Sequence, residues 1–506
     1  MIKNFKWLLL VSLTFVACNN NDDEVIVYDS SDGMPLTAGT ANFSKFVTLG
    51  NSLTSGYADN ALFIEGQKAS YVNILAQQFK LVGGGEFKVP FMADNIGGFK
   101  INGTQVAGPR LYFNGTAPVP VTGIPTTEIL NPAVVAAGPY NNCGVPGAKS
   151  FHLLSPSYGS AAGISTGTAN PYYVRFAPNA TTSVLAYAMS QTPTFFSLWI
   201  GNNDVLGYAT SGGDGTSAIT PSAGAAGVGF DATYDALVNT LTSAGAKGVI
   251  ANIPYVNTLP FFTTVPTNPV PLSAAQIGQL NPLFGAMNSM LAAAGQPARF
   301  QILAASATNP LLIADEMLAY DATALYTGGF TQAGYPPATA AFLGALYGKA
   351  RHASNATASK DFILLTARSL IGTTQPGYPA TNNTIGVTFP MQDNTTLTAS
   401  ETALVKAATD AFNVKIKGAA TAKGLAFVDA NAAMTQIANG GITANAFTIT
   451  NTFVTGGGFS TDGVHPSPRG YALIANKFIE AINTTYGSNL KGVDLGNYRI
   501  LFPKTL

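Results

Sequence analysis

Short apolar runs that alternate with amphipathic helical stretches constrain the fold of this chain more than any other feature of the sequence. The runs Phe46–Leu49, Thr194–Ile200 and Gly248–Pro254 have the length and composition of buried strands. The segments Ser70–Phe79 and Tyr234–Ala244 space their apolar residues as helices do. Strands that alternate with helices favour a parallel, doubly wound sheet covered by helices. We therefore predict an α/β fold with a parallel central sheet.

Composition limits the classes of partner. The chain has 506 residues, which suits several domains or one enlarged α/β domain. Lys plus Arg and Asp plus Glu each total 25, so the formal charge is zero and no basic surface for nucleic acid is indicated. Hydrophobic residues make up 47% of the chain and there are 53 glycines, which indicates a large core with long uncharged loops rather than disorder.

A signal peptide is indicated at residues 1–18. Lys3 and Lys6 precede an apolar run from Trp7 to Val16 that is too short to span a bilayer. The run ends in Phe15-Val16-Ala17-Cys18, which resembles the lipobox of bacterial lipoproteins. That resemblance implies a lipid on Cys18 and a cell envelope lipoprotein, in the outer membrane of a Gram-negative bacterium, that meets the membrane through this anchor only. An ordinary cleaved signal with a chance cysteine is the alternative.

Residues 19–42 lack periodicity and indicate a flexible tether. Its polar, acidic start, Asn19–Glu24, is similar to surface-export signals of some Gram-negative lipoproteins, although a plain spacer has the same composition. Nothing of transmembrane length follows residue 18. Residues 43–506 are expected to form one domain that carries an inserted subdomain at about 263–398, where the strand and helix rhythm changes. We predict a helix at Ala274–Ala294 and an acidic helix near Ala314–Leu318 within this insertion.

A serine lies at the corner where the first apolar run ends. Gly50 and Asn51 break the run directly before Ser52, and a helix-like pattern follows. Such a corner exposes the serine hydroxyl near backbone N–H groups that favour negative charge. Ser52 as a simple helix N-cap is the alternative.

The search for a base that could activate this serine is short, because the chain has only three histidines. His465 has an acid, Asp462, three residues earlier on a turn that opens the predicted last helix, Pro468–Ile482. One turn can therefore carry both a general base and the carboxylate that orients it. His152 and His352 have no such acid and are predicted to be surface or structural residues. An Asp-x-x-His pair by itself is more often a loop feature than a catalytic pair.

Four blocks together resemble the SGNH/GDSL hydrolase family. They lie in the family's order along residues 43–262 and 400–484, and they are Gly50-Asn51-Ser52-Leu53, Asn142-x-Gly144, Gly201-x-Asn203-Asp204 and Asp462-x-x-His465. The resemblance implies a flavodoxin-like three-layer α/β/α fold, the SGNH hydrolase fold, with Ser52 as nucleophile, His465 as base and Asp462 as orienter. It also implies an oxyanion hole made of the backbone N–H groups of Ser52 and Gly144 and the side-chain amide of Asn203.

The sequence departs from the family pattern at the first block. Asn51 stands where the family usually has Asp, and because this residue mainly shapes the corner we expect activity to survive. Thr54 occupies the place where the Gly-x-Ser-x-Gly elbow of α/β-hydrolases has glycine, which argues against that fold. Cys143 beside Gly144 is expected to be a small buried residue rather than a second nucleophile.

These observations predict a serine ester hydrolase of the lipase or esterase type. The apolar helices of the insertion and Phe261-Phe262 are expected to line an acyl-chain pocket. A carbohydrate O-acetyl esterase of the same fold is the first alternative, and a non-catalytic surface-binding lipoprotein is the second. The expected partner is a small-molecule, lipid or glycan ester and not a nucleic acid. No cofactor or metal is expected, since two cysteines and three scattered histidines offer no ligand cluster.

Overall fold

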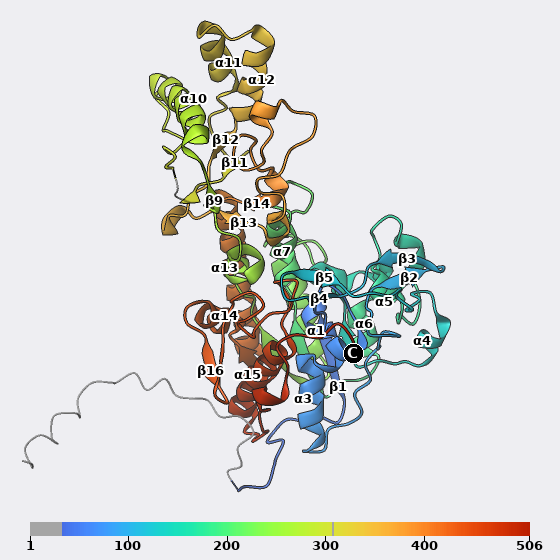
Figure 1. Ribbon diagram of the computed structural model, residues 1–506. Coiled ribbons are helices and arrows are strands. Elements are labelled where there is room, and N and C mark those ends of the chain that lie inside the picture. Colours follow the sequence, from blue (N-terminus) through green and yellow to red (C-terminus); the bar gives the residue numbers. More distant parts are fainter. Residues whose placement is uncertain (1–32, 306–307) are drawn as a thin grey trace, which may run out of the picture.

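The computed structural model describes residues 33–305 and 308–506 (Figure 1). The predicted signal peptide, the lipidation site at Cys18 and residues 19–32 of the tether lie outside the described residues. Across the described ranges, no helix is both long enough and apolar enough to cross a membrane.

A five-stranded parallel sheet forms the centre of the molecule, and its strands are β1 (Phe46–Gly50), β6 (Asn142–Gly144), β7 (Phe195–Trp199), β8 (Lys247–Ala251) and β15 (Ala426–Val428). The strands lie in the order β15-β8-β7-β1-β6, and every neighbouring pair is parallel. The predicted α/β fold with a parallel central sheet is confirmed.

The register of the sheet brings three corners to one edge. Gly50, the last residue of β1, pairs with Gly144 of β6 on one side and with Trp199 of β7 on the other. The chain therefore leaves all three strands at the same level, which is where ligand sites form in open α/β sheets. The glycines of Tyr140–Ala148 predict a turn, but residues 142–144 of this segment form the edge strand β6. Three residues are too few to show a periodicity, and the pairing with β1 alone makes them a strand.

Helices cover both faces of the sheet because apolar side chains alternate along the strands. Val47 and Leu49 of β1 face a core shared with the helices α6 (Val184–Met189), α8 (Phe230–Thr242) and α13 (Ala399–Lys423). Phe46 faces the opposite core, shared with α3 (Tyr71–Lys80) and α15 (Pro468–Tyr486). This alternation is the side-chain period of a strand, and it produces three layers.

The last helix, α15, begins and ends where its sequence dictates. Ser467 Oγ accepts the N–H of Gly470 at 3.0 Å, Pro468 occupies the first turn, and Gly487 ends the helix in the left-handed conformation. The helix buries Leu473, Phe478 and other apolar side chains against the sheet. Each such side chain contributes roughly 1.5–3 kcal/mol, so α15 is held firmly beside the turn that precedes it.

Short elements complete this body of the molecule. The helices are α1 (Ser52–Ser55), α2 (Ile64–Lys68), α4 (Pro132–Ala136), α5 (Pro171–Val174), α7 (Asn202–Thr210), α9 (Pro260–Thr263) and α14 (Ala430–Ala438). The strands form three antiparallel pairs, namely β2 (Phe99–Ile101) with β3 (Thr104–Ala107), β4 (Leu111–Phe113) with β5 (Pro118–Pro120), and β16 (Ile442–Ala444) with β17 (Phe447–Ile449).

The segment between α9 and α13 stands away from the sheet (Figure 1). It contains β9 (Val270–Pro271), α10 (Ala274–Ala293), β10 (Thr308–Asn309), β11 (Leu312–Ala314), α11 (Thr323–Gln332), α12 (Pro337–Tyr347), β12 (Ala350–His352), β13 (Phe362–Ile363) and β14 (Thr396–Leu397). Two small apolar cores lie entirely within it. The acidic helix predicted near Ala314–Leu318 is wrong: β11 ends at Ala314, and a turn follows in which Asp315 accepts the N–H of Met317 at 3.0 Å.

Candidate active site

Ser52 is the first residue of the short helix α1, directly after β1. Asn51 caps this helix, because its Oδ1 accepts the Leu53 N–H at 3.0 Å. The Asn51 amide also donates to Asn202 Oδ1 at 3.2 Å, which ties the corner after β1 to the corner after β7. The side chain at this position therefore shapes the corner, as expected, and an amide can both accept and donate there.

The structure brings Ser52, His465 and Asp462 together, although Ser52 and His465 are 413 positions apart. Ser52 Oγ lies 2.9 Å from His465 Nε2, and His465 Nδ1 lies 2.9 Å from Asp462 Oδ2. The His465 and Asp462 side chains are 15% and 9% exposed, so the base is open to a substrate while the carboxylate is shielded. The predicted acid, base and hydroxyl thus form one continuous hydrogen-bonded chain.

Asp462 is held as a carboxylate by its neighbours. Its Oδ1 accepts the backbone N–H groups of Val464 at 2.9 Å and His465 at 2.8 Å, and its Oδ2 accepts the N–H of Asn60 at 2.9 Å. Burial by itself would raise the pKa of Asp462, but the His465 ring and these backbone donors lower that pKa to about 2. An ionised Asp462 fixes the Nδ1–H tautomer of His465 and leaves Nε2 free to accept the serine proton.

A loop that follows α1 braces the catalytic turn, and sequence reasoning missed it. Asp59 Oδ1 accepts the N–H of Thr461 at 3.0 Å and its hydroxyl at 2.6 Å, while the Asp59 N–H donates to Ser460 Oγ at 3.0 Å. Asp59 and Asn60 both have positive φ, 52° and 63°, which turns their backbone toward the turn. The Asp-Asn pair was a readable turn signal, but nothing local indicates a partner some 400 positions away.

Gly144 does not have the role predicted for it. Its N–H donates to Asn142 Oδ1 at 2.9 Å, so this amide is already occupied. A Cβ at position 144 would lie 2.5 Å from Ser55 N, so the glycine is needed for close packing of β6 against α1. The Asn142 amide completes this contact by donating to Thr54 O at 3.0 Å. Gly144 and Asn142 therefore position the nucleophile helix rather than the oxyanion.

Three other donors lie at the corners that follow β1, β6 and β7. The backbone N–H groups of Ser52 and Gly147 have no hydrogen-bond partner among the described residues. Asn203 Nδ2 donates to Ala148 O at 2.9 Å, which places the Asn203 amide next to Gly147 and leaves its second N–H available. Gly147 has φ of +80°, a conformation that glycine adopts without strain.

Asp204 fixes this second corner. It is fully buried, and its two oxygens accept the N–H of Ser150 at 2.8 Å and the hydroxyl of Ser150 at 2.7 Å. Asp204 and Asn203 together fasten the segment after β6 to the start of α7. Of the two residues predicted at the end of β7, Asn203 thus faces the site and Asp204 supports it.

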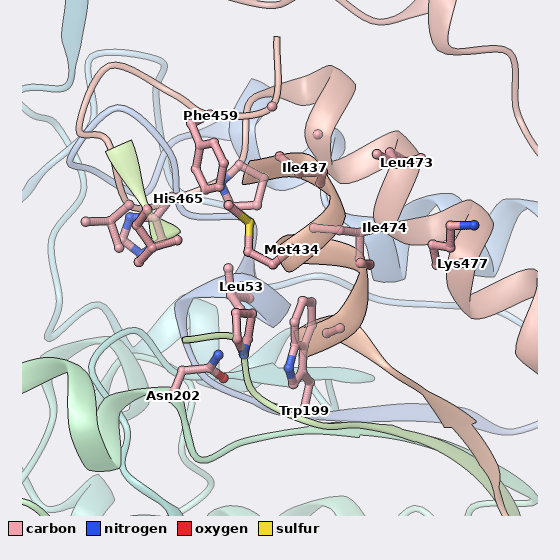
Figure 2. A pocket seen from close by; sticks show the side chains of 18 of the residues that line it. Leu53, Trp199, Asn202, Met434, Ile437, Phe459, His465, Leu473, Ile474 and Lys477 are labelled. Atoms are coloured by element: carbon pink, nitrogen blue, oxygen red, sulfur yellow. The ribbon is translucent and has the colours of Figure 1, made fainter. Parts of the chain in front are cut away.

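An apolar pocket adjoins Ser52 and His465 (Figure 2). Its volume is about 120 Å³, room for roughly ten water-sized spheres. Leu53, Trp199, Met434, Phe459 and Ile474 are among the lining residues, and Lys477 lies at the end away from His465. The walls include residues of α1, β7, α14 and α15, and the polar lining residues other than Lys477 lie toward the end with Ser52 and His465.

The insertion does not line this pocket, contrary to expectation. No residue of the described part of 263–398 is among the lining residues, and the apolar side chains of its helices fill a separate core. Phe261 and Phe262 of α9 are buried in the core beneath the sheet. The Phe261 N–H donates to Gly463 O at 2.9 Å, so α9 supports the catalytic turn. The pocket wall on α14 was not predicted, because this short Ala-rich helix has a weak apolar pattern.

The remaining histidines and the cysteine lie outside the site. His152 stacks on Tyr158 at 4.5 Å, and His352 packs edge-on against Phe284 at 4.8 Å. Burial lowers the pKa of each of these histidines to about 4. Cys143 is fully buried, and burial raises the pKa of its thiol to about 12. All three agree with the structural roles expected for them.

Comparison with protein-family models, with curated proteins and with solved structures finds no significant match to this chain. A functional proposal for this chain therefore rests on the residues of the site and their geometry.

Proposed function

We propose that this protein is a serine ester hydrolase of the SGNH/GDSL type that acts through an acyl-enzyme. One observation carries the proposal: Ser52 Oγ, the His465 ring and the Asp462 carboxylate are joined by two hydrogen bonds of 2.9 Å each. This is the arrangement that a serine nucleophile, its base and an orienting acid require. A non-catalytic binding protein has no need to keep these three groups in line.

The geometry supports a two-step reaction. Ser52 Oγ forms a bond to the ester carbonyl carbon while its proton passes to His465 Nε2. The tetrahedral intermediate then expels the alcohol, which takes that proton from His465 and leaves an acyl group on Ser52. A water molecule repeats the sequence on the acyl-enzyme, so the carboxylic acid is released and Ser52 regains its proton. Asp462 stabilises the His465 imidazolium in both steps.

The oxyanion hole is proposed to consist of the Ser52 N–H, the Gly147 N–H and the Asn203 side-chain amide. The two backbone groups are unpaired among the described residues, and the Asn203 amide is held beside Gly147 by its bond to Ala148 O. Preorganised donors of this kind stabilise the charge that develops on the carbonyl oxygen, and each typically contributes a factor of about 100 to 1000 in rate.

The fold supports the same family. Numbered in chain order, the five strands of the sheet lie in the order 2-1-3-4-5, which is that of flavodoxin-like doubly wound sheets. The nucleophile follows the first strand, the two corners that supply oxyanion donors follow the second and third, and the acid–base turn directly precedes α15. We propose that this is the SGNH hydrolase fold with an insertion, carried at the cell envelope by a lipid on Cys18.

The pocket favours an ester with an acyl chain of several carbons. Its walls beside Ser52 are almost entirely apolar, and they extend from His465 past Met434 to Ile474 (Figure 2). An acetyl group would leave most of this volume unfilled, whereas each buried CH₂ of a longer chain stabilises the complex by about 0.8 kcal/mol. A lipase or esterase is therefore preferred over a carbohydrate O-acetyl esterase.

Hydrolysis of p-nitrophenyl acetate, butyrate and octanoate by the full-length chain tests the proposal. Ser52→Ala and His465→Ala are expected to lower kcat by about 10⁴-fold or more. His152→Gln is the matched control, because it removes a half-buried histidine outside the site, and it should retain activity. Equal activity in all of these proteins would refute the hydrolase assignment. A preference for acetate over octanoate would instead favour the acetyl esterase.

A further inference from the structure

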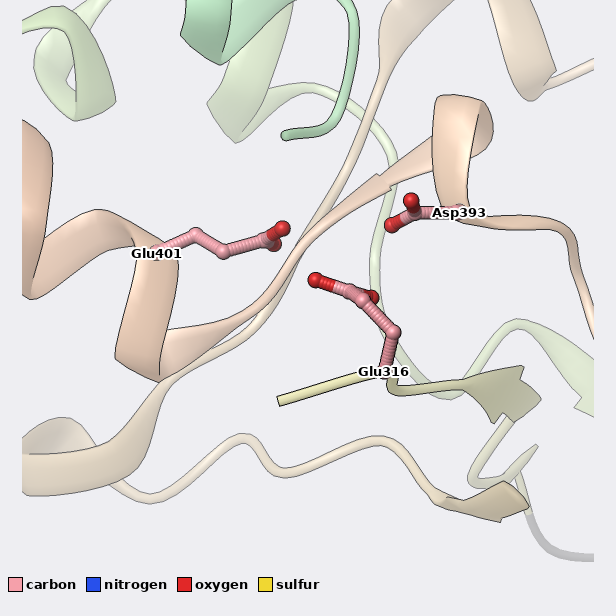
Figure 3. A group of neighbouring side chains, drawn as sticks. All are labelled: Glu316, Asp393 and Glu401. Carbon is pink, nitrogen blue, oxygen red and sulfur yellow. The ribbon is translucent and has the colours of Figure 1, made fainter. Parts of the chain in front are cut away.

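Three carboxylates gather where the insertion meets the body of the molecule (Figure 3). Glu316 lies on the turn after β11, Asp393 lies just before β14, and Glu401 lies in the first turn of α13. One oxygen of each side chain lies within 4.8 Å of the others. Glu316 and Asp393 belong to the insertion and Glu401 to the body, so the cluster spans the junction.

Glu401 has an oxygen that no donor satisfies. The side chain is fully buried, and its Oε2 accepts the N–H of Thr398 at 2.8 Å and the Thr398 hydroxyl at 2.9 Å. Its Oε1 is buried without a hydrogen-bond partner among the described residues, and the carboxylate points toward Glu316 and Asp393 (Figure 3). A buried carboxylate oxygen without a partner is costly, so a ligand bound at this atom would offset that cost.

A glycine and a second unsatisfied oxygen lie at the same point. Gly213 packs directly against Glu401, since a Cβ there would lie 1.9 Å from Oε1, and its φ is +79°. Asp393 Oδ1 is a second buried oxygen with no hydrogen-bond partner among the described residues. Two unsatisfied acceptors from opposite sides of the junction thus accompany the exposed Glu316 carboxylate.

The nearby cationic side chains are engaged elsewhere. Arg351 pairs with Asp315 at 2.6 Å and binds Asp361 through two bonds of 2.6 and 2.7 Å. Lys349 Nζ donates to the backbone carbonyls of Glu316 and Leu318. No side-chain cation of the described chain forms a salt bridge with Glu316, Asp393 or Glu401. Arg351 therefore offsets one of the two negative charges of Asp315 and Asp361, whereas Glu316, Asp393 and Glu401 have no cationic side-chain partner among the described residues.

The pKa shifts of Asp393 and Glu401 agree with the lack of a cationic partner. Burial raises the pKa of Asp393 and of Glu401 above ordinary carboxyl values, and the adjacent Glu316 raises both pKa values further.

We propose that Glu316, Asp393 and Glu401 bind a hard divalent cation, calcium, that fastens the insertion to helix α13. Calcium takes six to eight oxygen ligands at about 2.3–2.6 Å, so two ligands of one ion lie at most about 5 Å apart, as these oxygens do. Carboxylates suit calcium and magnesium, but magnesium usually uses only one or two of them and keeps several waters. The exposed side of Glu316 gives water access to complete the shell.

Isothermal titration of the EDTA-treated full-length chain with CaCl₂ tests the proposal, with MgCl₂ in a parallel titration. The wild type is expected to bind one calcium ion with a Kd at or below about 1 mM, and to unfold at a higher temperature when calcium is added. Glu401→Gln and Glu316→Gln should each weaken binding at least about tenfold and reduce the thermal shift. Because Glu316 is exposed, its variant will fold even if Glu401→Gln does not.

Asp410→Asn is the matched control, since it removes one negative charge from the same helix α13 at an exposed position. It should bind calcium as the wild type does. Absence of saturable calcium binding in the wild type would overturn the proposal and leave shared protons as the stabilising arrangement. Unchanged binding in Glu401→Gln and Glu316→Gln, or tighter binding of magnesium than of calcium, would also overturn it.

Discussion

Asn203 does two things with one side chain. Its amide holds the corner after β6 through the bond to Ala148 O, and its second N–H is the one proposed to bind the substrate oxygen. Neither role requires a charge, so an uncharged amide is well suited to a site where the negative charge exists only in the intermediate.

Replacement of this side chain should therefore slow the chemical step. Asn203→Ala is expected to lower kcat for p-nitrophenyl butyrate by about 100- to 1000-fold with little change in KM, because the donor acts in the transition state. Asn239→Ala, an Asn-to-Ala change at an exposed position of α8, serves as the control in the same steady-state assay. A variant that raises KM and leaves kcat unchanged would show that Asn203 binds the ground state instead.

The low pKa of Asp462 predicts a defined acid sensitivity. Because its pKa falls from an ordinary 3.8 to about 2 on folding, the carboxylate stabilises the fold above about pH 4, and this stabilisation is lost as the pH falls toward 2. The loss amounts to about 2 kcal/mol. Urea unfolding at pH 4 and pH 2 should show this loss in the wild type and not in Asp462→Asn. Parallel losses in the two proteins would contradict the assignment.

Sequence motifs predicted the residues of the proposed reaction but not the donors of the proposed oxyanion hole. Ser52, Asp462 and His465 could be predicted because their types and order are distinctive. Gly144 and Gly147 could not be separated by motif alone, since Gly144 ends a three-residue strand that local sequence does not reveal and Gly147 lies in the turn directly after it. A usable signal was present: an Asn side chain often bonds the backbone two residues on, and Asn142 occupies the Gly144 N–H in this way.

Helix α14 is the element that we expect to shape substrate choice. It contributes Ala433, Met434 and Ile437 to the pocket wall, opposite the nucleophile helix α1 (Figure 2). Ala433 is half-buried, so a larger side chain there would project into the pocket without requiring the core to move.

Ala433→Trp should therefore shorten the pocket. We expect kcat/KM for p-nitrophenyl octanoate to fall at least about tenfold relative to that for the acetate, since one or two displaced methylenes account for such a factor. Ala432→Trp introduces the same side chain at the adjacent exposed position, outside the pocket, and should leave the ratio unchanged. If both variants keep the wild-type ratio, the acyl chain does not enter this pocket.

Elements with a clear period were predictable, and short ones were not. The strands β1, β7 and β8 and the helix α3 are apolar or amphipathic over five residues or more, and the structure has them close to the predicted positions. By contrast, β6 and β11 have three residues each. Such strands exist because a neighbour pairs with them, so local sequence cannot reveal them.

At the scale of the whole molecule, the catalytic parts and the insertion are built separately. The triad is assembled from a corner near the N-terminus and a turn near the C-terminus, and β1, β7 and α15 hold them together. The insertion has its own apolar cores and meets the body near α9 and the start of α13. The sequence shows where the alternation of strands and helices changes, and this marks the insertion. It does not show in which direction the insertion projects from the sheet, so the prediction that its helices line the pocket was wrong.

The account as a whole depends on Ser52 being the group that becomes acylated. A p-nitrophenyl alkylphosphonate, which phosphonylates activated serines, can be incubated with the full-length chain and the modified residue located by peptide mass spectrometry. The account predicts stoichiometric modification of Ser52 in the wild type and none in His465→Ala. Modification at another residue, or an unmodified Ser52 in a folded and fully inhibited protein, would contradict it.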